Sequence, residues 1–290
     1  MGVTESSQKL DVRGLQYHIQ EWGDPSKPLL VLLHGWMDCG ATYKYVAPDL
    51  VENFFLVAPD LRGFGETEHV PGGYYFPDYF ADLEVILNHY SPNAPVNLVG
   101  HSMGGNIALM YAGIRPERIA RVMSLESLGL MPTEPKDAVE KYRRWLREIV
   151  SAEPAKVYPH AGFLMQSIHK GNPSLPDAVI EELAELWGRP VGDDGAWMLK
   201  HDHAHRYANP VRYMHEDVEE IWQQISARVG LVMAEHSMQY RGYTEAGRLS
   251  RARELLRISD DDYYLIENCN HMLHLEQPAQ TAAAIKQFFS

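Results

Sequence analysis

The stretch from Asn97 to Ala112, NLVGHSMGGNIALMYA, strongly constrains the fold, because an apolar strand pattern changes to helical spacing across a single serine. Ser102 stands between Gly100 and Gly104 in a G-x-S-x-G pattern. A strand that turns directly into a helix needs small residues on both sides of the turn, since neighbouring backbone approaches closely there. Such a turn lifts the serine hydroxyl out of the sheet and directs the start of the helix toward developing negative charge. We therefore interpret Ser102 as a nucleophile.

Short apolar runs alternate with helix-length segments over much of the chain. Continuous apolar runs are typical of strands that are buried on both faces of a sheet, and their alternation with helices favours parallel βα units. The 290 residues are enough for one large α/β domain or for a domain that carries an insertion. The strands that we predict cover residues 17–22, 29–33, 54–58, 96–100, 122–126, 229–234 and 263–267.

This alternation stops between Pro132 and about Trp222, where no convincing strand is visible and helical spacing continues. One apolar helix face there consists of Val139, Tyr142, Trp145, Leu146 and Ile149. Ligands of open α/β sheets bind outside the carboxyl ends of the strands, so an insertion at that edge would cover a site. We predict a helical cap at 132–221, inserted between core segments 1–131 and 222–290.

A serine nucleophile needs a base, and the chain has 14 histidines, so position must distinguish among them. His271 lies on the loop after the last predicted strand, in ENCNHMLHLEQP. Catalytic groups often sit on loops at strand ends. His274 is predicted to begin the last helix and to be packed. We therefore expect His271 to be the base.

Four motifs, in the order LLHGWMD, DLRGFGET, GHSMGG and NHMLHLEQP, resemble those of the α/β-hydrolase fold superfamily, and the resemblance covers nearly the whole chain outside the cap. The chain is most similar to serine hydrolase-like proteins and carboxylesterases. The resemblance implies a mostly parallel central sheet flanked by helices, with the cap following the strand that ends at Glu126. It also implies an oxyanion hole formed by the backbone N–H groups of Trp36 and Met103, and fixed backbone donors suit a tetrahedral oxyanion. Candidates for lining the substrate pocket are His34, Trp145 and Trp197.

The acid of the expected triad departs from the common pattern. Where many relatives have an aspartate after the strand VGLVMA, this chain has Ser237, which cannot stabilise an imidazolium as a carboxylate does. Glu126, at the end of the strand after the nucleophile helix, is the preferred substitute, and it keeps the order serine, acid, histidine. Glu235 is the alternative acid. A carboxylate at this place would fix which imidazole nitrogen faces Ser102.

The net charge of −13 predicts a surface that repels nucleic acid and anionic membranes rather than binding them. Two cysteines are too few for a disulfide framework, and we find neither an apolar leader nor a run long enough to span a membrane. These features favour a soluble cytoplasmic protein; they indicate no oligomeric state. His201, His203 and His205 alternate in HDHAH, but no cysteine or carboxylate set completes a metal site, so we expect no metal and that one of them could reach the pocket.

We expect a serine hydrolase that cleaves a small or medium carboxylic ester, or a thioester or lactone, through Ser102, His271 and Glu126 and an acyl-enzyme, without a cofactor. Two alternatives stay open, because fold alone does not fix function. One is a non-hydrolytic enzyme, a cofactor-free dioxygenase or lyase, in which the histidine–acid pair removes a proton from the substrate. The other is a ligand receptor on a hydrolase scaffold.

Overall fold

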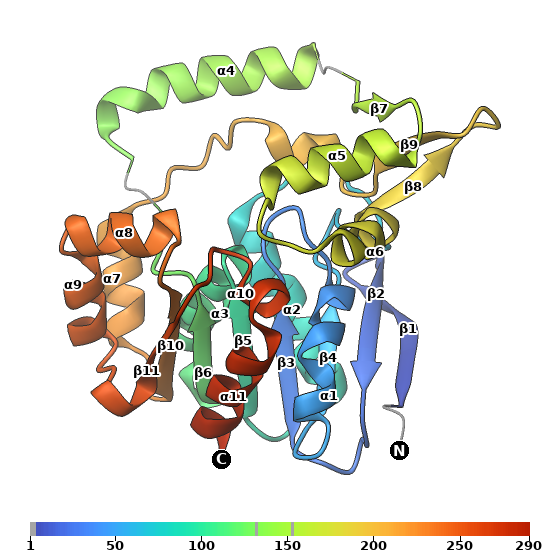
Figure 1. The fold of residues 1–290 in the computed structure, drawn as a ribbon. Coiled ribbons are helices and arrows are strands. Elements are labelled where there is room, and N and C mark those ends of the chain that lie inside the picture. Colours follow the sequence, from blue (N-terminus) through green and yellow to red (C-terminus); the bar gives the residue numbers. More distant parts are fainter. Residues whose placement is uncertain (1–3, 131–132, 152–153) are drawn as a thin grey trace.

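The computed structural model describes residues 4–130, 133–151 and 154–290. Its centre is an eight-stranded sheet with the order β1-β2-β4-β3-β5-β6-β10-β11, in which all neighbours from β4 to β11 are parallel and the pairs β1–β2 and β2–β4 are antiparallel (Figure 1). The strands are β1 (Glu5–Val12), β2 (Leu15–Trp22), β3 (Leu29–Leu33), β4 (Phe55–Pro59), β5 (Val96–His101), β6 (Ile119–Leu125), β10 (Arg228–Ala234) and β11 (Tyr263–Ile266).

Both faces of the sheet are buried, which is why its central strands are continuous apolar runs. Along β3, Val31 and Leu33 join one core cluster, whereas Leu30 and Leu32 join the cluster on the opposite face. The first face is covered by α2 (Phe76–Tyr90), α3 (Met103–Ile114), α7 (His215–Gln223) and α9 (Arg248–Leu255). The second is covered by η1 (Gly40–Tyr45), α1 (Ala47–Leu50), α10 (Leu273–Glu276) and α11 (Pro278–Phe289). The remaining core helices are η2 (Pro116–Arg118), α8 (Met238–Glu245) and η5 (Asp260–Asp262).

The described elements between β6 and α7 form a roof across one end of the sheet (Figure 1). Its elements are η3 (Pro135–Asp137), α4 (Ala138–Val150), β7 (Val157–Tyr158), α5 (Ala161–Gly171), α6 (Asp177–Trp187), β8 (Gly188–Val191), β9 (Ala196–Leu199) and η4 (His203–Arg206). Leu164, Ile168, Ile180 and Leu183, together with Tyr158, give this roof a small core of its own.

One expectation for this segment needs correction. We expected no strand there, but β7, β9 and β8 form a three-stranded antiparallel sheet. The strands are only two to four residues long, so their apolar pattern is too short to recognise. Helix α7 crosses residue 221, where the cap was predicted to end, and packs Val218 and Trp222 into the main core. The cap bounds 132–221 stay a prediction. Residue 132 itself lies outside the described residues.

No helix of the described ranges is both long and apolar enough to cross a lipid bilayer.

Candidate active site

Ser102 occupies the sharp turn between β5 and α3, with φ of 51° and ψ of −113°. A positive φ is strained for a residue with a side chain, and such strain is typical of functional sites. The turn is possible because glycine stands on both sides of Ser102, at positions where other backbone atoms lie too close to leave room for a side chain. A Cβ atom on Gly100 would lie 2.1 Å from the Gly104 carbonyl oxygen, and one on Gly104 would lie 2.2 Å from the Leu33 carbonyl oxygen. The glycines therefore hold the turn, which presents the Ser102 hydroxyl at the carboxyl edge of the sheet.

The structure brings Ser102, His271 and Glu126 into one connected group. His271 Nε2 lies 2.9 Å from Ser102 Oγ, and His271 Nδ1 lies 3.2 Å from Glu126 Oε2. A carboxylate at Nδ1 favours the imidazole tautomer that carries its proton there, which leaves Nε2 free to accept the serine proton. These distances meet the geometric requirement for a nucleophile, a base and an orienting acid.

Glu126 is held rigidly in this position. It follows β6 with φ of 59°, and its N–H donates to the carbonyl oxygen of Val232 at 2.8 Å. Its side chain is fully buried, and Oε1 accepts a 2.6 Å hydrogen bond from the N–H of Ala234. One carboxylate oxygen thus contacts β10 and the other contacts His271, so the buried charge is hydrogen-bonded on both sides.

Glu235, the alternative acid, is placed differently. Its Oε2 accepts a hydrogen bond from the N–H of Asn268 at 3.0 Å, and its side chain is 41% exposed. Ser237, at the position where an aspartate was expected, caps α8, and its Oγ accepts a 2.9 Å hydrogen bond from the N–H of Tyr240. The carboxylate that the structure brings to His271 is therefore that of Glu126.

The two expected oxyanion donors flank the serine. Met103 is the first residue of α3, and a backbone N–H at that position has no partner within its own helix. Trp36 lies in the loop after β3, where Gly35 comes so close that a Cβ atom on it would lie 3.2 Å from Ser102 Cβ. Both residues line the cavity at Ser102, and their backbone N–H groups stay the predicted oxyanion donors.

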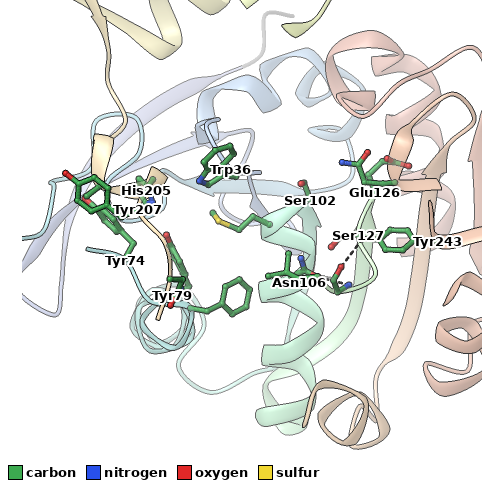
Figure 2. A pocket seen from close by; sticks show the side chains of 17 residues that line it. Trp36, Tyr74, Tyr79, Ser102, Asn106, Glu126, Ser127, His205, Tyr207 and Tyr243 are labelled. Atoms are coloured by element: carbon green, nitrogen blue, oxygen red, sulfur yellow. Dashed lines mark hydrogen bonds between the residues drawn. The ribbon is translucent and has the colours of Figure 1, made fainter. Parts of the chain in front are cut away.

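A cavity of about 420 Å³ opens over Ser102 (Figure 2). Aromatic side chains make up much of its wall, and none of the described residues that line it is a lysine or an arginine. The aromatic residues among them are Trp36, Tyr74, Phe76, Tyr79, His205, Tyr207 and Tyr243. Figure 2 shows Trp36 near Ser102, and Tyr243 near Glu126 on the other side of the serine from Tyr74 and His205. Aromatic side chains therefore supply much of the contact surface that a bound group would meet in this cavity.

The three alternating histidines of HDHAH are divided between different cavities. His205 lines this cavity and stacks between Phe64 and Tyr74, with ring centroids at 3.8 and 3.6 Å. Burial lowers the pKa of His205 to about 2, so its ring is neutral at physiological pH. His201 and His203 line a separate cavity. One histidine of this group was expected to reach the pocket, and His205 is the one that lines the cavity, as part of its aromatic wall.

The described residues that line this cavity do not include His34, Trp145 or Trp197, which were predicted as pocket residues. His34 is fully buried, and its Nδ1 and Nε2 lie 2.7 Å from the Gly35 carbonyl oxygen and 2.9 Å from the Leu61 nitrogen, so it supports the loop. Trp197 lies on β9 and packs with the core of the roof. Trp145 lies on α4, which has no buried residue. Parts of the pocket wall come from α2, η4 and α8. The spacing of residues in the sequence did not indicate that these helices lie near Ser102.

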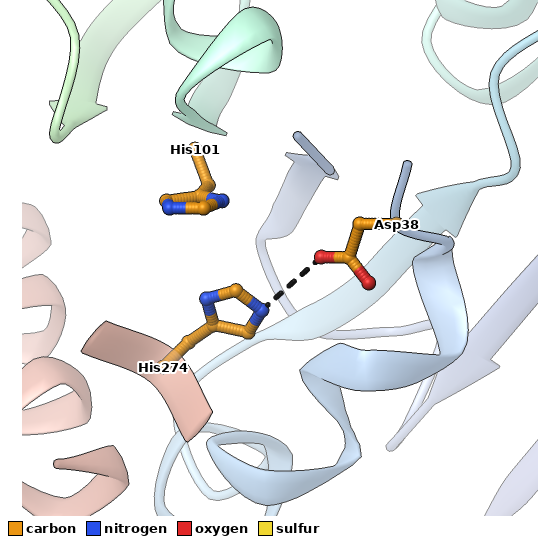
Figure 3. A group of neighbouring side chains, drawn as sticks. All are labelled: Asp38, His101 and His274. Atoms are coloured by element: carbon orange, nitrogen blue, oxygen red, sulfur yellow. Dashed lines mark ion pairs between the residues drawn. The ribbon is translucent and has the colours of Figure 1, made fainter. Parts of the chain in front are cut away.

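A buried cluster beside the site was not predicted (Figure 3). Asp38 pairs with His274, Oδ2 to Nε2, at 3.3 Å, and Asp38 Oδ2 accepts a 3.1 Å hydrogen bond from Thr42 Oγ1. Its other oxygen, Oδ1, accepts a 2.9 Å hydrogen bond from Trp187 Nε1, at the end of α6. The Asp38 carboxylate therefore links the roof to the loop after β3 and to α10.

His101 joins this cluster to the candidate base. Its Nε2 lies 2.8 Å from the carbonyl oxygen of His271, and burial lowers the pKa of His101 well below its usual value, so a neutral ring donates this hydrogen bond. The ligand atoms of Asp38, His101 and His274 lie within 4.8 Å of one another, which would allow a metal ion. Within the group, Asp38 and His274 form an ion pair, and the ring centroids of His101 and His274 lie 4.8 Å apart. The contact that reaches the His271 loop is the hydrogen bond of His101.

Comparison with known proteins agrees with this geometry. The family model described as alpha/beta hydrolase fold matches residues 28–172. A serine hydrolase-like protein of Danio rerio is 26% identical over 277 residues, covering 93% of this chain and 83% of that protein. Serine hydrolase-like protein 2 of Homo sapiens is 25% identical over 281 residues, covering 92% and 88%.

Among solved structures, the thioesterase domain from the curacin biosynthetic pathway superposes with a TM-score of 0.84 at 23% identity, covering 99% of this chain and 100% of that one. At this identity the likeness concerns the fold. The family match spans half of the chain, and the relatives above align over most of it. The chain is therefore a hydrolase that belongs to the alpha/beta hydrolase fold family.

Proposed function

We propose that the protein is a serine hydrolase that cleaves a small or medium carboxylic ester, or a related thioester or lactone, through Ser102, His271 and Glu126. The observation that carries this proposal is the continuous chain of contacts from Glu126 through His271 to the Ser102 hydroxyl at the floor of a cavity. Nucleophile, base and acid in hydrogen-bond contact are the requirement for nucleophilic catalysis by a hydroxyl group.

In the proposed reaction, Ser102 Oγ attacks the acyl carbon while His271 Nε2 takes its proton. The N–H groups of Met103 and Trp36 stabilise the oxyanion of the tetrahedral intermediate. The intermediate collapses as the bond to the leaving group breaks, and His271 returns the proton to that group. Water then attacks the acyl-enzyme with His271 again as base, which releases the acid and restores Ser102. Glu126 keeps the His271 ring oriented and stabilises its charged form.

The cavity supports a neutral acyl group. Its aromatic wall provides apolar contact, and the described lining residues offer no lysine or arginine for a carboxylate or phosphate on the substrate. Glu126 is the acidic residue in the lining, and its oxygens are already hydrogen-bonded. We therefore propose that charged acyl groups are poor substrates and that uncharged acyl groups are good ones.

The test combines an activated fluorophosphonate with a series of p-nitrophenyl esters of increasing acyl length. The proposal expects stoichiometric labelling at Ser102, multiple turnovers, and loss of both in Ser102→Ala. Labelling without turnover would favour a ligand receptor. Turnover that persists in Ser102→Ala, or oxygen uptake with a heteroaromatic substrate, would favour a cofactor-free dioxygenase or lyase. In such an enzyme the histidine–acid pair removes a proton from the substrate.

A further inference from the structure

Helix α4 has an apolar face that nothing in the described chain covers. None of its residues is buried, and Val139, Leu146 and Val150 are 59%, 52% and 81% exposed. Figure 1 shows α4 above the rest of the roof. Exposed apolar side chains that gather on one face mark an interaction site more often than scattered ones do.

The least exposed positions of α4 show which side faces the protein. They include Ala138, Lys141, Trp145 and Glu148, which recur at helical spacing. Glu148 Oε2 accepts a 2.5 Å hydrogen bond from the N–H of Ala208, which attaches this side of α4 to the segment after η4. The opposite side therefore faces solvent.

The solvent-facing part combines apolar and basic residues. At 100° per residue, Val139, Leu146 and Val150 lie along one line on the helix surface and form an apolar stripe. Tyr142 and Ile149 lie beside this stripe, on the side nearer the protein. Arg143 and Arg147 follow the outer edge of this stripe. Of the charged residues in α4, four are basic and two are acidic, in a chain whose net charge is −13. The helix is thus a basic amphipathic element on an acidic protein.

We propose that α4 is an interfacial helix that docks the protein on an anionic lipid surface. Helices of this composition lie in the plane of a membrane with the apolar face among the acyl chains and the basic residues at the head groups. The charge of α4 is opposite to that of anionic lipid, and the acidic remainder of the protein is screened beyond about 8 Å at physiological salt. The docking does not depend on the proposed hydrolysis, since α4 contributes no lining residue to the cavity at Ser102.

The experiment is sedimentation of the full-length protein with vesicles of phosphatidylcholine alone and of phosphatidylcholine mixed with phosphatidylglycerol. The wild type should bind the mixed vesicles, more weakly as salt is raised, and should bind the neutral vesicles much less. Leu146→Glu with Ile149→Glu should abolish binding. Arg143→Gln with Arg147→Gln should weaken binding to mixed vesicles by roughly 30-fold, since each basic residue near the surface contributes about 1 kcal/mol.

The matched control is Ile114→Glu. Ile114 is 43% exposed but ends α3, which starts at the carboxyl edge and runs to the opposite edge of the sheet, so this variant should bind vesicles as the wild type does. All variants should hydrolyse a soluble p-nitrophenyl ester at the wild-type rate if they are folded, and circular dichroism checks the fold if the protein is not an esterase. Equal binding of the α4 variants and the wild type would overturn the proposal. A different outcome would assign this face to a second copy of the chain: the wild type binds no vesicles and forms a dimer, and Leu146→Glu with Ile149→Glu converts that dimer to monomers.

Discussion

Glu126 is bonded at both carboxylate oxygens, to the N–H of Ala234 at 2.6 Å and to His271 Nδ1 at 3.2 Å. The position after β10 where an acid was expected is occupied by Ser237, whose hydroxyl caps α8. A helix cap and a catalytic acid require different placements of a side chain. In the proposed mechanism, the acid therefore lies at the end of β6 and the helix cap at the end of the neighbouring strand β10.

Glu126→Gln tests the acid directly. The amide has nearly the same shape but carries no charge. Its NH₂ group could donate a hydrogen bond to His271 Nδ1, which disfavours the tautomer that carries the proton on Nδ1. We expect kcat/KM for p-nitrophenyl esters to fall by a factor on the order of 10³–10⁴ while the melting temperature changes little. Glu235→Gln is the matched control and should keep near-normal turnover, because Glu235 contacts Asn268 rather than His271. An active Glu126→Gln with an inactive Glu235→Gln would reverse the assignment.

At the element scale, the β5–turn–α3 unit requires glycine where backbone approaches backbone. In Gly104→Ala the new methyl group would meet the Leu33 carbonyl oxygen, and a central sheet strand cannot move away easily. We expect a loss of about 1–3 kcal/mol in unfolding free energy, measured by urea denaturation. The matched control is Gly242→Ala in α8, where a Cβ atom meets nothing within 4 Å, and this change should stabilise by about 0.5–1 kcal/mol. Equal effects of the two substitutions would contradict the packing argument.

How far the sequence predicts each element depends on how local its signals are. The turn at Ser102 was predictable because its glycines and its change of period lie within a few residues. β1 was missed because ESSQKLDV is polar and mostly exposed, so no apolar pattern marks this edge strand. β7, β8 and β9 depend on pairing with one another. The pocket wall could not be predicted, because it depends on how η4 and α2 meet above the serine.

At the scale of the whole molecule, several histidines are buried in neutral form around the carboxyl edge of the sheet. Burial lowers the pKa of His34, His101, His201 and His205, the last two to about 4 and about 2. Between the folded value and the ordinary value of 6.5 the unfolded chain binds more protons than the folded chain, so stability rises with pH in this range and falls as the solution is acidified below 6.5. Each such group contributes up to about 1.4 kcal/mol per pH unit.

His205→Phe isolates one of these contributions. Phenylalanine can keep the stacking between Phe64 and Tyr74 but binds no proton, so the free energy of unfolding should depend less on pH, by about 1.4 kcal/mol per pH unit, well below pH 6.5. Urea denaturation at a series of pH values measures the slope. Phe64→Leu is the matched control. It disturbs the same stack but removes no titrating group, so the loss in the free energy of unfolding should be the same at every pH. If the curves of His205→Phe and the wild type run parallel, His205 is not the source of acid sensitivity. In that case the stacked ring would have to be protonated in the folded protein, and a charge would stand in the wall of a cavity that otherwise suits an uncharged acyl group.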